Sequence, residues 1–178
     1  MTDYLLTSEA FVKDKTPIFD NINGKYILSA IREAQEGRLQ SVIGTALLEK
    51  LKALCKAGEI ETYADGAYYT LIQKCQMATA YQAIAELAHI TSYKITNKGV
   101  VKTSDDRVEN ATESEIIRTA KYYQSKADRY VGDLQRYLLA NRNKYPELND
   151  ADCANIRANL HSSATCGLWL GGYRGKKI

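Results

Sequence analysis

Two long helix-prone stretches, residues 66–93 and 112–145, are separated by one polar segment, residues 94–111, that contains Gly99. Neither long stretch contains a proline, and both are rich in Ala, Leu, Ile, Glu, Lys and Gln, which are good helix formers. The pattern therefore predicts an all-α fold, a bundle built on two long helices with one excursion between them.

The first long stretch is apolar over much of its circumference. A stretch of this kind is expected to be buried on most sides, as the central helix of the domain. One apolar stripe holds Leu71, Cys75, Ala78, Gln82, Ala85 and Ala88, and a neighbouring stripe holds Ile72, Tyr81, Ile84 and Leu87.

The second long stretch has a clear start and a clear stop. Thr112 and Glu115 have the spacing of a capping box, in which each side chain bonds the backbone amide of the other residue. Pro146 is expected to end the helix, because the residue before a proline avoids the helical region. A helix of this length would reach about 50 Å.

Shorter helices are expected before and after the long pair. One begins at Asn23, buries Ile27, Leu28, Ile31 and Ala34, and is interrupted at Gly37. A second covers residues 39–54 and ends at Gly58, which can adopt a left-handed C-cap. After Pro146, Asp150 or Asp152 is expected to cap a short helix through Ile156 and Leu160.

The segment between the long helices reads as a small β-hairpin. Two β-branched runs flank a turn-forming Asn-Lys-Gly sequence, and a polar continuation follows through residues 105–107. We expect the excursion to be a contact element of the helical domain, residues 1–160. Its candidate interface residues are Ile95, Asn97, Lys98, Gly99, Val100, Val101 and Lys102.

We expect residues 161–178 to form an extended C-terminal arm, because the end of the chain from residue 166 onward is glycine-rich and cannot be a regular helix. Apolar residues in a free arm are a liability unless they bind somewhere, so we expect this arm to be held by its own domain or by another chain. A contact with nucleic acid or an acidic protein surface and a merely solubilising terminus both fit its basic end. Its candidate interface residues are Leu168, Trp169, Leu170, Tyr173, Arg174, Lys176 and Lys177.

Composition excludes several classes of protein. The net charge of +3 is too small to indicate nucleic acid by itself. The chain starts without the pattern of a secretion signal and has no apolar run long enough to cross a bilayer, so we expect synthesis in a cytoplasm. Thirteen tyrosines against two phenylalanines suit either half-buried interfaces or a helical core with hydrated edges.

No set of residues resembles an active site, so we predict a protein that is not an enzyme and needs no cofactor or metal. Cys153, His161 and Cys166 match no zinc-binding spacing, and no phosphate-binding glycine motif is present. A nucleophilic pair of Cys75 and His89 is possible in principle, but nothing indicates a third residue to orient it.

Five short motifs follow one another over residues 5–148: IREAQ at 31–35, VIGTALLEKL at 42–51, ITNKGV at 95–100, YLLAN at 137–141 and YPE at 145–147. In their order and spacing they resemble the head–tail connector (adaptor) proteins of tailed bacteriophages, particularly those of gut Bacteroidales phages and prophages. The chain beyond Cys153 matches no part of that pattern.

This resemblance implies a structural virion protein at the head–tail junction. Connectors form homo-oligomeric rings, commonly dodecamers, that dock beneath the portal protein, extend the channel for genomic DNA without reading its sequence, and offer a platform to further neck or tail proteins. Such a subunit is made in the bacterial host cytoplasm and has no membrane partner. Long helices, tyrosine-rich faces and a terminal arm suit the side-to-side contacts of a ring.

Two other interpretations remain open. The basic arm and the Lys and Arg residues of the second long helix favour a nucleic-acid-binding packaging or regulatory protein. A helical enzyme using Cys75 and His89 is the third.

Overall fold

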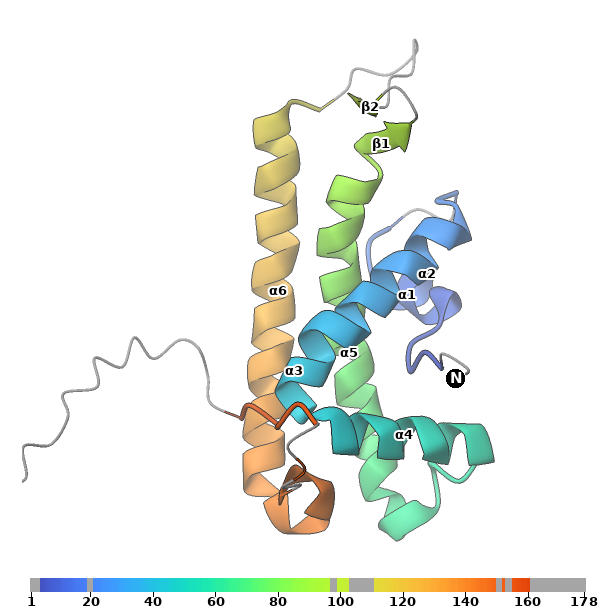
Figure 1. The fold of residues 1–178 in the computed structure, drawn as a ribbon, viewed down its shortest axis with the longest axis vertical. Coiled ribbons are helices and arrows are strands. Elements are labelled where there is room, and N and C mark those ends of the chain that lie inside the picture. Colours follow the sequence, from blue (N-terminus) through green and yellow to red (C-terminus); the bar gives the residue numbers. More distant parts are fainter. Residues whose placement is uncertain are drawn as a thin grey trace, which may run out of the picture.

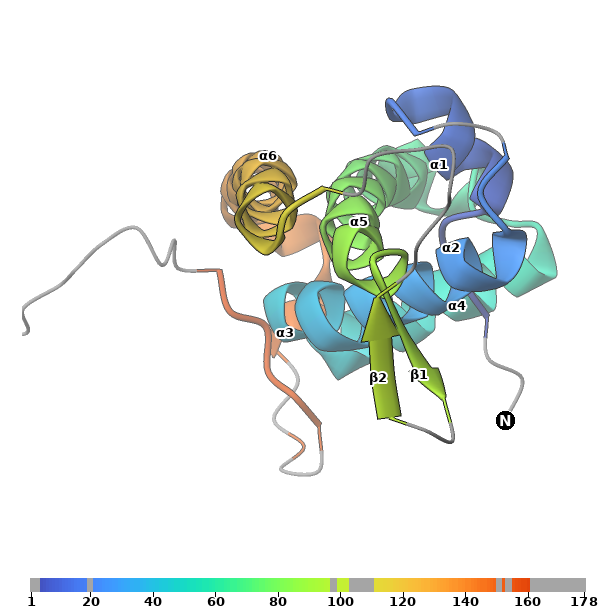
Figure 2. The same ribbon diagram turned by 90° about the horizontal axis from the view of Figure 1, so that it is seen from above.

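The computed structural model describes residues 4–18, 21–96, 99–102, 111–149, 152 and 155–160. Its fold is all-α, as predicted, and is organised around two long antiparallel helices, α5 (Ala67–Ile90) and α6 (Glu113–Ala140). They lie side by side in both views (Figures 1 and 2), and α2 (Gly24–Glu33) crosses α5 on one side. No helix in the described part of the chain is long and apolar enough to cross a membrane.

Residues 24–43 form one continuous helical segment. α1 (Glu9–Lys15) precedes α2, and α2 continues through a π-helical turn, η1 (Ala34–Leu39), into α3 (Gln40–Ile43). The predicted interruption at Gly37 is wrong, because the π-turn carries the helix past this glycine. The helix ends instead at Gly44, whose φ of 83° is left-handed.

The π-turn coincides with a buried amide. Gln35 is fully buried in this turn. Its side-chain oxygen accepts a bond from the Leu6 amide at 2.8 Å, and its nitrogen donates to the Tyr4 carbonyl at 3.1 Å. Gln76 of α5 donates to the Leu6 carbonyl at 2.8 Å. These bonds hold the N-terminal segment against the helices and satisfy a polar group that would otherwise be costly to bury.

α4 (Thr45–Ala57) crosses the lower part of the molecule in Figure 1 and ends at Gly58, as predicted, with Gly58 in the left-handed conformation at a φ of 72°. A 3₁₀ turn, η2 (Tyr63–Gly66), then leads into α5. Leu28, predicted to be buried, is 41% exposed, because only the Ile27 and Ile31 side of α2 faces α5.

α5 is the central helix, as predicted, and its side chains enter two core clusters. One cluster includes Leu71 and Cys75 with Leu134 and Leu138 of α6, and the other includes Ala83 and Leu87 with residues of α1 and α2. Contact with neighbours on several sides explains why a single apolar stripe could not be read from this helix.

The α6 helix starts as predicted and stops earlier than predicted. Both bonds of the capping box between Thr112 and Glu115 are present. The helix ends at Ala140 rather than at Tyr145, so that it spans about 42 Å. Two 3₁₀ turns, η3 (Arg142–Lys144) and η4 (Pro146–Asn149), follow, and they turn the chain back so that Tyr145 is fully buried.

At the other end of the long pair lie two short strands, β1 (Tyr93–Thr96) and β2 (Gly99–Lys102) (Figure 1). They pair antiparallel, with Tyr93 opposite Lys102 and Thr96 opposite Gly99. Most of the predicted excursion over 94–111 lies outside the described residues, so its extent and its role stay predictions.

The predicted short helix through Ile156 and Leu160 is wrong. Residues 155–160 have no helical assignment. Backbone groups of this segment bond to residues 42 and 45 instead of to one another, so helix formation is outcompeted by a tertiary contact.

Candidate functional site

A groove lies between α5 and α6 and is lined by residues of both helices. It encloses about 330 Å³, and we call it the α5–α6 groove. Its floor is largely hydrocarbon, since a methionine, a tyrosine ring and the stem of a lysine contribute to it. The lining residues are Thr70, Gln73, Lys74, Met77, Tyr130 and Asp133.

Aromatic rings and cations surround one end of this groove. Tyr130 stacks on Tyr81 with ring centroids 5.1 Å apart and an angle of 20° between the planes. The Lys126 ammonium lies 4.9 Å from the Tyr122 centroid and 5.9 Å from that of Tyr81, and the Arg129 guanidinium lies 5.2 Å from that of Tyr130. Such cation–π contacts hold long side chains over the rings and give the face an aromatic and basic character.

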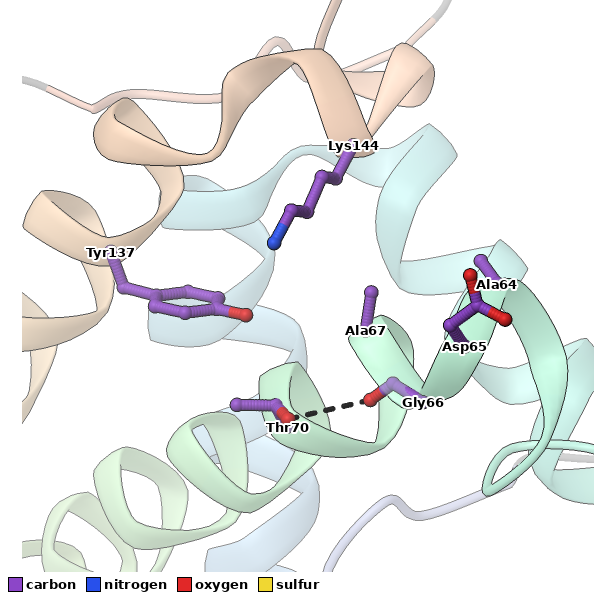
Figure 3. Close-up of a pocket in the computed structure, with 7 residues that line it drawn as sticks. All are labelled: Ala64, Asp65, Gly66, Ala67, Thr70, Tyr137 and Lys144. Atoms are coloured by element: carbon purple, nitrogen blue, oxygen red, sulfur yellow. Dashed lines mark hydrogen bonds between the residues drawn. The ribbon is translucent and has the colours of Figure 1, made fainter.

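The groove continues into a second hollow of about 420 Å³ at the N-terminus of α5 (Figure 3), since Thr70 lines both. The side chains of Tyr137, from the last turn of α6, and Lys144, from η3, extend into this hollow from across the helix pair. Its lining residues are Ala64, Asp65, Gly66, Ala67, Thr70, Tyr137 and Lys144.

The wall of the second hollow is a left-handed turn. Ala64, Asp65 and Gly66 have φ values of 50°, 54° and 74°. The left-handed conformation costs about 1–2 kcal/mol for a residue with a Cβ atom, so the surrounding contacts have to stabilise this turn. Among these contacts, Thr70 donates to the Gly66 carbonyl at 3.3 Å and Tyr145 donates to the Ala67 carbonyl at 3.0 Å.

Tyr145 links the two long helices below the groove. Its ring contacts Tyr68 edge-on, with centroids 5.2 Å apart, and its hydroxyl lies 2.9 Å from that of Tyr137. Burial, and then the bond to Tyr137, raise the pKa of Tyr145 above its ordinary value. Tyr68 donates to Glu147 at 2.8 Å, and burial followed by this bond raises the pKa of Tyr68. The network joins the segment that follows α6 to the first turn of α5.

The root of the C-terminal arm is attached to the other side of the molecule. The Asn159 amide donates to the Val42 carbonyl at 3.0 Å, and the Thr45 amide donates to the Ile156 carbonyl at 2.9 Å. Gln135 of α6 donates to the Asn159 carbonyl at 2.9 Å, and Leu160 is buried at 9% exposure. We call residues 155–160 the arm root; they cross beside α3 in Figures 1 and 2.

The arm root and the groove use opposite sides of α6. At 3.6 residues per turn, Gln135 lies about 140° around the helix axis from Tyr130 and about 160° from Asp133. One helix therefore connects two surfaces of different composition.

The predicted interface residues are only partly within the described structure. Ile95, Gly99, Val100, Val101 and Lys102 lie in the β1–β2 pair, at the end of the molecule opposite to η3 and η4. The remaining predicted residues lie outside the described part of the chain: Asn97, Lys98, Leu168, Trp169, Leu170, Tyr173, Arg174, Lys176 and Lys177.

The geometry does not support a nucleophilic pair of Cys75 and His89. Cys75 and His89 lie on the same helix about 21 Å apart along its axis, too far to act as a pair. Burial raises the pKa of the Cys75 thiol to about 12, which disfavours the nucleophilic thiolate. Within the described residues no three His, Cys, Asp or Glu side chains could hold a metal ion. Cys153, His161 and Cys166 lie outside that part.

Sequence reasoning missed both the groove and the arm root. A third stripe on α5, spaced three and four residues apart through Thr70, Gln73, Lys74 and Met77, was a signal for the groove. Asp65-Gly66 is a turn dipeptide that could have drawn attention to the left-handed turn. Nothing local indicates that residues 155–160 bond to residues 42 and 45, because that contact depends on the whole fold.

The fold and these surfaces define an all-α protein with a long helical pair, an exposed groove and a separately anchored C-terminal segment. A family model matches residues 39–158, more than half of the chain, and the protein belongs to this family, the family of unknown function DUF6712. No curated protein and no solved structure is significantly similar to the chain.

Proposed function

We propose that this protein is a structural virion protein, a subunit of the head–tail connector ring of a tailed bacteriophage. In this role it docks beneath the portal, extends the DNA channel and provides a platform for the tail. The sequence motifs at 31–35, 42–51 and 137–141 support the proposal through their order and spacing. The matched family has no assigned function and neither supports nor opposes it.

The observation that carries the proposal is the pair of unlike surfaces on opposite sides of α6. A ring subunit needs two different patches that meet each other on neighbouring copies, because such head-to-tail contacts close by rotation. Two such patches are present here. One is the α5–α6 groove, with Met77 and Tyr130, and the other is the arm root beside Gln135. The tyrosine network at the base of the helix pair would keep the two at a constant distance.

In this proposal the two ends of the molecule have separate partners. The excursion over 94–111 is a hairpin-like extension whose β1–β2 pair projects beyond the helices, where a portal or tail protein can reach it. The arm, residues 161–178, is extended and reaches a neighbour. Apolar anchors such as Trp169 suit a segment that becomes ordered on binding.

Two measurements test this function. Light scattering and electron microscopy of the purified full chain, alone and mixed with a portal protein from the same genome, are expected to show a closed ring or a ring on the portal. Peptide mass spectrometry of purified virions should detect the protein in the particle. A chain that stays monomeric at every concentration, does not bind the portal and is absent from virions would overturn the proposal.

A nucleic-acid-binding packaging or regulatory protein is the second candidate function. The stacked Tyr81 and Tyr130 beside Lys126 and Arg129 favour it, because rings and cations together suit single-stranded nucleic acid. This function predicts strongly salt-dependent DNA binding that falls when residues 174–178 are deleted, or on Lys126→Ala with Arg129→Ala. Weak binding that these changes do not alter would count against it.

A further inference from the structure

The α5–α6 groove has the size and lining of a site for apolar side chains. Its volume of about 330 Å³ lies near the lower limit of about 300 Å³ at which pockets hold a small ligand. Met77 and Lys74 are half-buried. Tyr130 lines the groove and also stacks on Tyr81. Sulfur and ring atoms together favour an aromatic occupant.

The chain itself supplies a segment of matching chemistry. Eighteen residues follow Leu160, and they include the sequence Leu168-Trp169-Leu170. Trp169 is the single tryptophan of the protein. It lies nine positions beyond the buried Leu160, a distance of about 30 Å when extended, which is enough to reach an adjoining molecule.

The position of the arm root favours the groove of another copy over the groove of the same chain. Asn159 is attached to Gln135, on the side of α6 opposite to Tyr130 and Asp133. To enter its own groove, the arm would have to turn back around α6. An arm that continues outward instead meets another copy.

We propose that residues 168–170 of the arm bind in the α5–α6 groove of a neighbouring copy, with the Trp169 indole against Met77 and Tyr130. This contact rests on the proposed ring and assigns its side-to-side partner surfaces. Each subunit gives one arm and receives one, so the contact is head-to-tail and closes when the rotation between copies closes.

Paired full-length variants test this inference. Met77→Asp places a charge in the groove, and Trp169→Ala removes the anchor from the arm. Each alone is expected to weaken self-association by about 30-fold or more, the effect of a hot-spot residue. An equimolar mixture retains intact arms on one variant and intact grooves on the other, so it is expected to form heterodimers that do not extend further.

Thr70→Phe is a second groove variant, which tests the contact independently of whether Met77→Asp folds. Thr70 is exposed and lies at the junction of the two hollows, so the larger ring narrows the groove without burying a charge. Thr70→Phe should therefore also weaken self-association. Leu28→Asp is the matched control, because Leu28 is an exposed apolar residue on α2, 41% exposed and outside the groove. It should leave association unchanged.

Tryptophan fluorescence separates the possible outcomes, because Trp169 is the single tryptophan of the protein. In wild-type protein its emission is expected to shift to shorter wavelengths as association proceeds, and Met77→Asp should abolish the shift. Emission already shifted in dilute monomers would place the arm in its own groove and overturn the inference. Rings that form normally with both Met77→Asp and Thr70→Phe would overturn it too, while leaving the connector function intact.

Discussion

A Cβ atom at Gly44 would lie 2.8 Å from the backbone nitrogen of Ala158. Gly44 also has a φ of 83°, so it combines a conformation that favours glycine with a close approach of two backbones. Thr45 and Val42, on either side of it, bond residues 156 and 159. The arm root can therefore lie at the α3–α4 junction because this position has no side chain.

Gly44→Ala is expected to reduce the free energy of unfolding by about 2 kcal/mol or more, through backbone strain and displacement of the arm root. Urea unfolding gives the stability, and the rate of trypsin cleavage after the exposed Arg157 should rise. Gly58→Ala is the matched control: Gly58 has a φ of 72°, yet a Cβ there meets nothing within 4 Å. Equal cleavage rates in the two variants would contradict this account.

Tyr145→Phe is expected to reduce stability by about 1–2 kcal/mol, because Tyr137 and the Ala67 carbonyl each lose a partner in a buried place. The ring stays, so the packing against Tyr68 should persist. Thermal and urea unfolding measure the loss. Tyr122→Phe, at a residue that is 57% exposed, serves as the comparison and should change little. If both variants lose the same stability, the network is not what stabilises the base of the helix pair.

Gly132→Ala should increase stability by about 0.5–1 kcal/mol. Gly132 lies inside α6, where glycine is unfavourable, and an added Cβ meets nothing within 4 Å in the single chain. Urea unfolding at a concentration where the protein is monomeric measures the effect. A loss of stability in the monomer would show that the interior of α6 is not the regular helix described above.

Cys75 should make stability fall at alkaline pH. Burial, followed by the influence of Cys55, raises its pKa from 9.0 to about 12. Between these values the unfolded chain has released the thiol proton and the folded chain still holds it. The contribution is therefore complete below pH 9 and is lost as the pH rises toward 12, at about 1.4 kcal/mol per pH unit.

The Cys75→Ala variant tests this dependence. It should be less stable near pH 7, since it leaves a small cavity. Its stability should then decline less steeply than that of the wild type between pH 9 and pH 11, as measured by urea unfolding at each pH. Parallel curves for the two proteins would mean that Cys75 does not cause the alkaline loss.

Features that depend on a few neighbouring residues were predictable. The capping box joins Thr112 to a residue three positions away, and Gly58 follows directly on the last turn of its helix. The all-α class and the two long helices follow from propensity and periodicity summed over many residues, which outweigh any single contact.

Features that depend on distant parts of the chain were not predictable. Gly37 was expected to interrupt a helix, but the buried Gln35 bonds to Tyr4 and Leu6 and the helix passes through a π-turn. Tyr145 was expected to extend α6, but its burial against Tyr68 turns the chain back after Ala140.

The sequence by itself determined that the chain forms two long helices with an excursion between them, because propensity and capping act within one or two turns. Only the tertiary structure decided where those helices end, that the α5–α6 groove opens between them, and that the arm root lies on the opposite side of α6. The last relationship depends on Gly44 and Gln135 meeting residues 156–159, and burial and hydrogen bonding between such distant positions have no local signature.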